Sequence, residues 1–319
     1  GYKIAICEQT EDPAQAKGLV DRDIIRVVTP GTVIASSMLE DSKNNYICAI
    51  YADSAAFGLC LCDISTGEVY ASSFPAGGEG LEHLQNELAR FHPAEAVLSS
   101  GAWNADGLAP FLRDRLDCLC ENGGEARFRI GAARPLAEKQ FKTGLDGIPP
   151  QDEAALQAAG GLLAYLYETQ KTDLSHISAL TYYTAGQFME LDLTARQTLE
   201  LTSTMRGKEK KGSLLWVLDK TRTAMGGRLL RGWMERPLLS PARIARRQQG
   251  VAGLVEDAIT RDELALALRE VTDLERLAGR VVYGSAGSRD LAALSAGLGK
   301  LPHIRDLLSA CPAPLLQEL

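Results

Sequence analysis

The spacing of apolar and polar residues in the first half of the chain predicts short strands followed by alternating helices and strands. The first three runs are rich in β-branched and aromatic residues and cover residues 46–51, 57–63 and 68–74. An antiparallel meander is the economical pairing for runs separated only by turn residues. Next come a predicted helix at residues 81–91, a buried strand at 94–98 and a second helix at 106–116. This order predicts an α/β sheet domain.

The second half of the chain carries apolar residues at helical spacing almost throughout. The predicted helices cover residues 153–171, 241–254, 262–269, 273–282 and 289–301. Ser240 and Pro241 give the second of these a strong start, because serine caps a helix and proline is favoured at the first helical position. A short extended piece at residues 177–183 lies between the two regions, and residues 140–150 are the predicted flexible loop. The expected fold class is multidomain: an α/β domain followed by an all-α domain.

Residues 212–239 predict two short helices joined by a polar turn. Ser213 can cap the first helix and Thr223 the second by accepting a backbone N–H. The apolar residues of the first helix are Leu214, Leu215 and Leu218, and those of the second are Met225, Leu229, Leu230, Trp233 and Met234. We expect these residues on one side of each helix, while Arg228 and Arg231 point elsewhere.

Two adjacent glycines, Gly226 and Gly227, lie inside the second of these helices. Each glycine weakens a helix by roughly 1 kcal/mol relative to alanine, so something other than helix propensity must favour the pair. We expect close packing of the backbone against a neighbouring segment at this point.

Length and composition predict an intracellular, multidomain protein. A chain of 319 residues is long enough for about two domains, and its 45% apolar content is ordinary for globular domains. No apolar run approaches the ~18 residues that span a bilayer, and there is no basic-plus-apolar signal segment. We therefore expect a cytoplasmic location and no membrane partner.

Seven cysteines and four histidines do not predict a metal site. Cys60 and Cys62 are two residues apart, as are Cys118 and Cys120, which is not the spacing of zinc or redox motifs. Free cysteine behaves as a small buried hydrophobe, so buried free thiols are expected. The histidines are scattered along the chain and add no ligand cluster.

Basic residues are concentrated in one part of the helical region, although the whole chain carries a net charge of −7. Residues 196–247 contain thirteen Lys and Arg against four Asp and Glu, a net charge of +9 that leaves −16 for the rest. Such a block can face nucleic acid or an acidic partner domain, but a set of solvated helix faces is the commoner case. The sharpest piece, RGKEKK at residues 206–211, predicts an exposed loop. Its candidate weak DNA contacts are Arg206, Lys208, Lys210 and Lys211.

Three segments together resemble the MutS family of DNA mismatch repair proteins. Residues 212–239 carry the Gly-Ser-Leu-Leu run, the Leu-Asp-x-Thr-x-Thr turn, Met-Gly-x-Arg-Leu-Leu, a Trp and Pro-Leu. YKIAICEQ at residues 2–9, followed by Asp12-Pro13, Lys17-Gly18 and RVVTPGT, resembles the end of the family's first domain and its exit linker. DLTARQTLEL at residues 192–201 resembles the start of the family's core. Three matches in the family's order are more specific than any single short motif.

The resemblance implies three regions. They are the end of the mismatch-recognition domain with its linker at residues 1–33, an RNase H-like connector domain at 34–173, and the first part of a helical core with its lever at 174–319. The implied role is to couple the binding of mismatched double-stranded DNA to an ATPase, with a connector surface for a MutL-type partner and a homodimer in the whole protein. The candidate coupling hinge comprises Asp219, Thr221, Thr223, Gly226, Gly227 and Arg228.

The family's chemical elements are expected outside this chain. A search for G-x-x-x-x-G-K-[ST] finds no P-loop, so no cofactor is expected here, and ATP and Mg are implied for an ATPase domain downstream. The Phe-x-Glu element that wedges into a mismatch is implied upstream of residue 2. The chain starts in a predicted strand without a methionine and ends inside an apolar helical pattern. We therefore expect a fragment that is not itself an enzyme.

Two other functions match parts of the pattern. A family paralogue that acts on recombination junctions tends to lack the first domain, and YKIAICEQ argues against it. Meander strands followed by alternating helix and strand are also the order of RNase H-type nucleases, which hold two divalent metals with clustered carboxylates. The available acids, Asp53, Asp63 and Glu68, each lie beside a turn residue, where acids favour local backbone hydrogen bonds. A scaffold and partner-binding surface is the expected role of this region.

Overall fold

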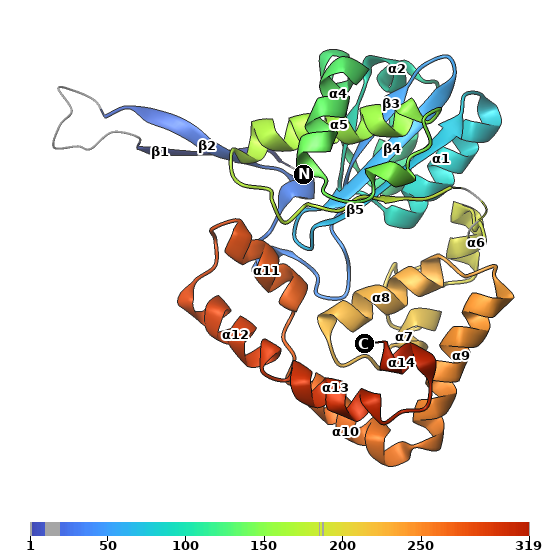
Figure 1. Ribbon diagram of the computed structural model, residues 1–319. Coiled ribbons are helices and arrows are strands. Elements are labelled where there is room, and N and C mark those ends of the chain that lie inside the picture. Colours follow the sequence, from blue (N-terminus) through green and yellow to red (C-terminus); the bar gives the residue numbers. More distant parts are fainter. Residues whose placement is uncertain (1, 10–19, 185, 187, 319) are drawn as a thin grey trace. The chain divides into compact units, whose positions relative to one another are not determined.

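The computed structural model divides the chain into two compact units (Figure 1). It describes residues 2–9, 20–184, 186 and 188–318. The first unit comprises Gly1–Leu39 and Asn45–Tyr183, and the second comprises Glu40–Asn44 and Thr184–Leu319. The short segment Glu40–Asn44 therefore belongs to the second unit, although its neighbours on both sides in the chain belong to the first. The predicted boundaries after residues 33 and 173 stay predictions.

An antiparallel two-stranded ribbon lies near the start of the first unit. β1 (Ile4–Gln9) pairs with β2 (Arg22–Val28), and most side chains of both strands are exposed. β1 lies where the sequence predicts a strand at the start of the chain. The positions of the family pattern at residues 12–13 and 17–18 lie outside the described residues.

A mixed six-stranded sheet forms the centre of the first unit, in the order β7-β6-β3-β4-β5-β8. Its strands are β3 (Ile47–Ala52), β4 (Ala56–Asp63), β5 (Glu68–Pro75), β6 (Glu95–Leu98), β7 (Leu119–Asn122) and β8 (Thr181–Tyr182). β3, β4 and β5 form the antiparallel meander that the sequence predicts. β6 pairs in parallel with β3, and so does β7 with β6 and β8 with β5. The α/β prediction for this region is therefore confirmed as a mixed sheet.

Helices cover this sheet and connect its parallel strands. They are α1 (Gly78–Phe91), α2 (Ser100–Asn104), α3 (Leu108–Pro110), α4 (Ile130–Gln140) and α5 (Glu153–Gln170). α5 packs against β3 and β4, and Gly58 of β4 permits this approach. A Cβ at Gly58 would lie 1.9 Å from the carbonyl oxygen of Ala154, so any larger residue would push α5 away. Every residue of β3 is buried, as expected of a strand that is covered on both faces.

Three features of this unit differ from the sequence prediction. The helix predicted at residues 106–116 consists of α3 and a π-helical turn at Phe111–Arg115. The sequence pattern gives no sign of α4, because its buried positions include small alanines and a proline lies inside it. The predicted flexible loop at residues 140–150 is tied to its neighbours by hydrogen bonds, including one from Lys142 N to Ser178 O at 2.7 Å.

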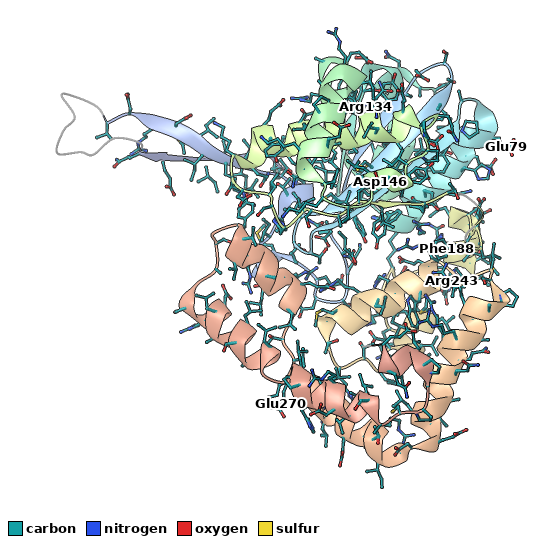
Figure 2. The ribbon with its side chains drawn as sticks, in the orientation of Figure 1. Glu79, Arg134, Asp146, Phe188, Arg243 and Glu270 are labelled. Carbon is teal, nitrogen blue, oxygen red and sulfur yellow. The ribbon has the colours of Figure 1, made fainter. Side chains whose placement is uncertain are left out.

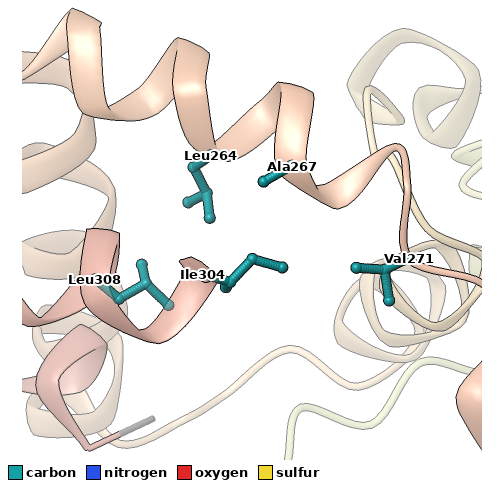
Figure 3. Packing of buried hydrophobic residues seen from close by; sticks show 5 residues of the cluster. All are labelled: Leu264, Ala267, Val271, Ile304 and Leu308. Atoms are coloured by element: carbon teal, nitrogen blue, oxygen red, sulfur yellow. The ribbon is translucent and has the colours of Figure 1, made fainter. Parts of the chain in front are cut away.

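Helices make up most of the second unit. They are α6 (Leu193–Thr198), α7 (Leu214–Leu218), α8 (Ala224–Glu235), α9 (Pro241–Glu256), α10 (Ala258–Leu268), α11 (Leu274–Val282), α12 (Ser288–Leu298), α13 (Leu301–Ser309) and α14 (Pro314–Gln317). Leu264 and Ala267 of α10 pack with Ile304 and Leu308 of α13 and with Val271 in a buried apolar cluster (Figure 3). The prediction of a helical second region is confirmed.

Capping side chains fix the starts of several of these helices. Ser213, Thr223 and Ser240 each accept a backbone N–H in the first turn of α7, α8 and α9, as the sequence predicts. Asp257 caps α10 in the same way, so this helix begins before the predicted residue 262. None of the described helices is long and apolar enough to cross a membrane.

Candidate functional site

The predicted hinge begins with a turn that Asp219 closes. Its Oδ1 accepts hydrogen bonds from the backbone N–H of Thr221 at 3.1 Å and from the Thr221 hydroxyl at 2.6 Å. Its Oδ2 pairs with Lys210 Nζ at 2.6 Å. Burial alone would raise the pKa of Asp219, but the hydrogen bonds from Lys210 and Thr221 hold that pKa below its usual value. The carboxylate therefore stays charged at neutral pH and ties the preceding loop to the turn.

The two glycines lie in the first turn of α8, where space is limited. Thr223 caps the helix by accepting a hydrogen bond from Gly226 N at 3.0 Å, and a Cβ at Gly226 would lie 3.0 Å from the same hydroxyl oxygen. A Cβ at Gly227 would lie 3.3 Å from Ser42 Cβ. The absence of a side chain at Gly227 therefore lets α8 lie close to the segment Glu40–Asn44.

Arg228 is buried at the centre of a set of oxygen acceptors. Its Nη1 donates to Asp273 Oδ2 at 2.7 Å and to the backbone oxygen of Asp41 at 3.0 Å. Its Nη2 donates to Asp273 Oδ1 at 2.8 Å and to Glu275 Oε2 at 2.6 Å. Burial alone would lower the pKa of the guanidinium, but the two carboxylates raise it above its usual value. Arg228 therefore joins α8, the start of α11 and the segment Glu40–Asn44 with a permanent charge.

The buried face of α8 is not the one that its apolar pattern predicts. Arg228 is only 5% exposed, whereas Leu229 is 57% and Trp233 38% exposed. Arg231 pairs with Glu235 and is largely covered. The prediction that Arg228 and Arg231 point away from the packed side was wrong. Carboxylates from another part of the chain offset the cost of burying the Arg228 guanidinium, and spacing within one helix cannot reveal them.

Arg276 is a second buried arginine that the sequence pattern does not single out. It lies on α11 and is 4% exposed. Its Nη1 donates to the backbone oxygen of Glu40 at 3.0 Å, and its Nη2 donates to the backbone oxygen of Lys43 at 2.7 Å. The only sequence signal is an arginine beside acidic residues at a helix start, which is also common on exposed helices.

The four candidate DNA contacts are not equivalent in the structure. Arg206, Lys208 and Lys211 are exposed, as the predicted loop requires. Lys210 is half-buried and pairs with Asp219, so its charge is directed into the turn. Only the first three are therefore free to meet a polyanion, and a DNA role for this loop stays a prediction.

The rest of the basic block is only partly a solvated surface. Arg243, near the start of α9, is exposed (Figure 2). Arg246 pairs with Glu318, and the guanidinium of Arg247 lies 3.7 Å from the ring centre of Trp233. An ion-paired arginine such as Arg246 contributes less to a long-range positive field than an unpaired one.

The acids near the strand ends of the sheet act as local hydrogen-bond acceptors. Asp63 is buried and accepts from Asn45 N at 3.1 Å and from Ser65 Oγ at 2.6 Å. Asp53 and Glu68 accept hydrogen bonds from their own turn or from a neighbouring tyrosine. Within the part of the chain that the structure describes, no group of three or more His, Cys, Asp or Glu side chains could hold a metal ion.

The cysteines are free thiols, and most of them are buried. Burial raises the pKa of the Cys60 thiol above its usual value, which keeps it protonated and unreactive. The prediction of buried thiols was wrong for Cys7, because it lies on the exposed ribbon, and Cys120 is only partly buried.

Comparison with known families accounts for the order of the two units. Models described as MutS domain I, MutS domain II and MutS domain III match residues 1–37, 45–178 and 194–319. The chain belongs to the MutS family. In this MutS-family chain the segment Glu40–Asn44 falls between the matches to domains I and II, and the hinge and Arg276 fall within the match to domain III.

Curated relatives of this chain carry the name DNA mismatch repair protein MutS. The relative from Ruminiclostridium cellulolyticum is 42% identical over 318 residues, which cover 100% of this chain and 36% of the relative. The relative from Symbiobacterium thermophilum is 43% identical over 320 residues, again covering 100% of this chain and 36% of the relative. The chain thus spans about a third of the length of the curated relatives it matches.

Proposed function

We propose that this chain is the coupling part of a MutS-type mismatch repair protein. In the whole protein it would transmit a change between the site that binds mismatched double-stranded DNA and an ATPase domain that binds ATP and Mg. The chain itself is expected to be neither an ATPase nor a nuclease. The observation that carries the proposal is the buried Arg228, which joins α8, Asp273 and Glu275 to the segment that follows domain I in the sequence.

A coupling element must have two discrete packed arrangements that both ends of the system can bias. Asp219, Thr221 and Thr223 define the turn before α8, while Gly226 and Gly227 allow close approach. A small rotation of α8 would move the Arg228 guanidinium relative to its acceptors, and buried ion pairs lose much of their energy when their geometry is disturbed. The hinge residues are therefore proposed as coupling residues rather than catalytic ones.

We further propose that the sheet-containing unit is an RNase H-like connector domain. In its sheet, β3, β4 and β5 are antiparallel, and β6 and β7 extend β3 in parallel, which supports that assignment. The acids expected at a nuclease centre are engaged locally, which favours a scaffold. Its surface is proposed to meet a MutL-type partner, and the whole protein is proposed to be a cytoplasmic homodimer.

The experiment uses the full-length protein that carries this sequence. The equilibrium affinity for a mismatched duplex would be measured with and without ATP, in the wild type and in the Gly227→Val variant. A coupling role predicts that the ATP effect on DNA affinity shrinks by about fivefold or more, which is within the usual range of allosteric coupling. DNA affinity without ATP and ATP affinity without DNA should change much less. An equal loss in both binding steps and an unchanged ATP effect would contradict the proposal.

A further inference from the structure

The segment Glu40–Asn44 is held in the helical unit by its backbone. The carbonyl oxygens of Glu40 and Lys43 accept hydrogen bonds from Arg276, and that of Asp41 accepts one from Arg228. The side chains of Glu40 and Asp41 are exposed. The two arginines therefore bind the backbone of the segment and not its side chains. Such hydrogen bonds depend little on which side chains the segment carries.

Asp273 contacts both arginines that bind the segment. Asp273 Oδ1 accepts a hydrogen bond from the backbone N–H of Arg276 at 3.3 Å, and Asp273 binds both terminal nitrogens of Arg228. Both guanidiniums are nine-tenths or more buried, at 5% and 4% exposed for the two residues. Charged donors form stronger hydrogen bonds than neutral ones. Together Arg228, Arg276 and Asp273 form a carbonyl-binding site, which we call the latch.

The stretch of chain that leads to this segment, starting at Thr29, is also held in place, within the first unit. Glu95 of β6 is fully buried and accepts hydrogen bonds from the Thr29 hydroxyl and from Gly31 N, the latter at 3.1 Å. Asn45 Nδ2 donates to the backbone oxygen of Pro30 at 2.9 Å. Residues 29–44 therefore form a strap that is held at residues 29–31 in the first unit and at residues 40–43 in the second.

We propose that the latch is a fastening of residues 40–44 that opens and closes, and that Arg276 and Arg228 are the positioning residues for the backbone of this segment. When the latch is closed, residues 40–44 are held in the helical unit. When it is open, the strap keeps only its contacts in the first unit, which include those with Glu95 and Asn45. The role in coupling rests on the proposed function, whereas the closed latch rests on the contacts of this chain alone.

Limited proteolysis tests the latch without DNA or ATP. Trypsin cuts the Lys43–Asn44 bond only after the Lys43 carbonyl has left Arg276 and entered the protease oxyanion hole. Cleavage of a native segment requires such local opening, so this bond should be cut about tenfold or more slowly than the Arg206–Gly207 bond of the exposed loop. A glutamate-specific protease at the Glu40–Asp41 bond gives an independent readout, because that carbonyl is also bound by Arg276.

Arg276→Lys keeps the positive charge, but a single ammonium group cannot bind two separate carbonyl oxygens as the guanidinium does. Cleavage at Lys43 should therefore accelerate by about tenfold or more. The matched control is Arg261→Lys, at an exposed arginine of α10 that pairs only with its neighbour Asp262 among the described residues. Cleavage at Arg206 should be unchanged in both variants and gives the reference rate for an exposed bond. If Arg276→Lys does not fold, the latch is still tested in the wild type by comparing the cleavage rates of the Lys43–Asn44 and Arg206–Gly207 bonds.

Two results would overturn the latch: equal cleavage rates at Lys43 and Arg206 in the wild type, or a rate at Lys43 that Arg276→Lys does not change. Slow cleavage at Lys43 that accelerates in Arg276→Lys supports it. Failure of coupling in the full-length protein with a protected Lys43–Asn44 bond would refute the proposed function and leave the latch standing, so the two failures are distinguishable.

Discussion

Asp273 and Arg228 form a bidentate ion pair, with Asp273 Oδ2 at 2.7 Å from Arg228 Nη1 and Asp273 Oδ1 at 2.8 Å from Arg228 Nη2. The same carboxylate caps α11 by accepting the backbone N–H of Arg276. One side chain therefore binds the Arg228 guanidinium of α8 and caps α11, the helix that carries Arg276. This makes Asp273 the residue on which the latch geometry most depends.

Stability of the helical unit should depend on the charge of Asp273. Burial alone would raise its pKa, but Arg228 and Arg276 hold the pKa below its usual value. A carboxylate with a depressed folded pKa contributes stability that is fully present above its unfolded pKa of about 3.9 and is lost as the pH falls through the folded pKa. We expect part of the acid destabilisation below about pH 4 to come from this residue.

The variant Asp273→Asn tests that dependence by urea unfolding at several pH values. Leaving Arg228 without its main partner should cost on the order of 3 kcal/mol at neutral pH. The difference between variant and wild type should shrink toward low pH, where the wild-type carboxyl is also neutral. A difference that is constant from pH 7 to pH 2 would contradict the assignment.

Gly227 should be intolerant of a branched side chain. Valine at this position would press its methyl groups on Ser42, because even a Cβ would lie 3.3 Å from Ser42 Cβ. We expect Gly227→Val to lose on the order of 1–3 kcal/mol in unfolding free energy. A pair of milder substitutions tests whether this contact is the cause. The loss of stability in Gly227→Ala should be partly restored by Ser42→Gly, which removes the Cβ atom that the new alanine would contact. Additive effects of these two changes would show that the contact does not matter.

The buried Glu95 should need each of its donors. Tyr165 donates its hydroxyl to Glu95 Oε1 at 2.6 Å inside the first unit. Tyr165→Phe removes that donor and leaves the carboxylate less satisfied, at an expected cost of about 1–3 kcal/mol. The same substitution at Tyr2, which is 89% exposed, is the matched control and should be nearly neutral. Equal unfolding midpoints for the two variants would argue against a structural role of the Glu95 fastening.

The chain alone should bind no ATP and should bind DNA weakly, without preference for a mismatch. The sequence holds no P-loop, and its exposed basic loop offers Arg206, Lys208 and Lys211 as phosphate contacts. Binding to duplex DNA should fall steeply with salt, as counterion release requires. Saturable micromolar ATP binding by calorimetry, or a preference for mismatched over matched duplex at equal salt, would contradict this expectation.

Local patterns in the sequence were sufficient for the elements whose cause is local. The meander follows from three β-rich runs with turn residues between them, and Ser213, Thr223 and Ser240 cap helices as short-range chemistry dictates. The helix α4 was not predicted, because its small buried alanines produce no apolar stripe in the sequence.

The candidate site depended on contacts between residues far apart in sequence. Arg228 meets Asp273 and Glu275, which lie more than forty residues later, and it meets the backbone of Asp41, which lies 187 residues earlier. An apolar-stripe argument assigns arginine to the solvent side by default and cannot account for such partners. Arg276 was missed for the same reason, because its acceptors are backbone oxygens that carry no sequence signal.

The most direct test of the coupling account is a reversible lock on the latch in the full-length protein. The double variant Ser42→Cys and Gly227→Cys places two Cβ atoms near the ~3.5–4.5 Å spacing of a disulfide, so oxidation should fix the strap to α8. The rate of ATP-induced release from a mismatched duplex would then be measured before and after reduction, with each single variant as a control. The account predicts release slowed by about tenfold or more in the oxidised double variant alone, and restored by reductant. Release at the same rate with the disulfide formed and reduced would contradict it.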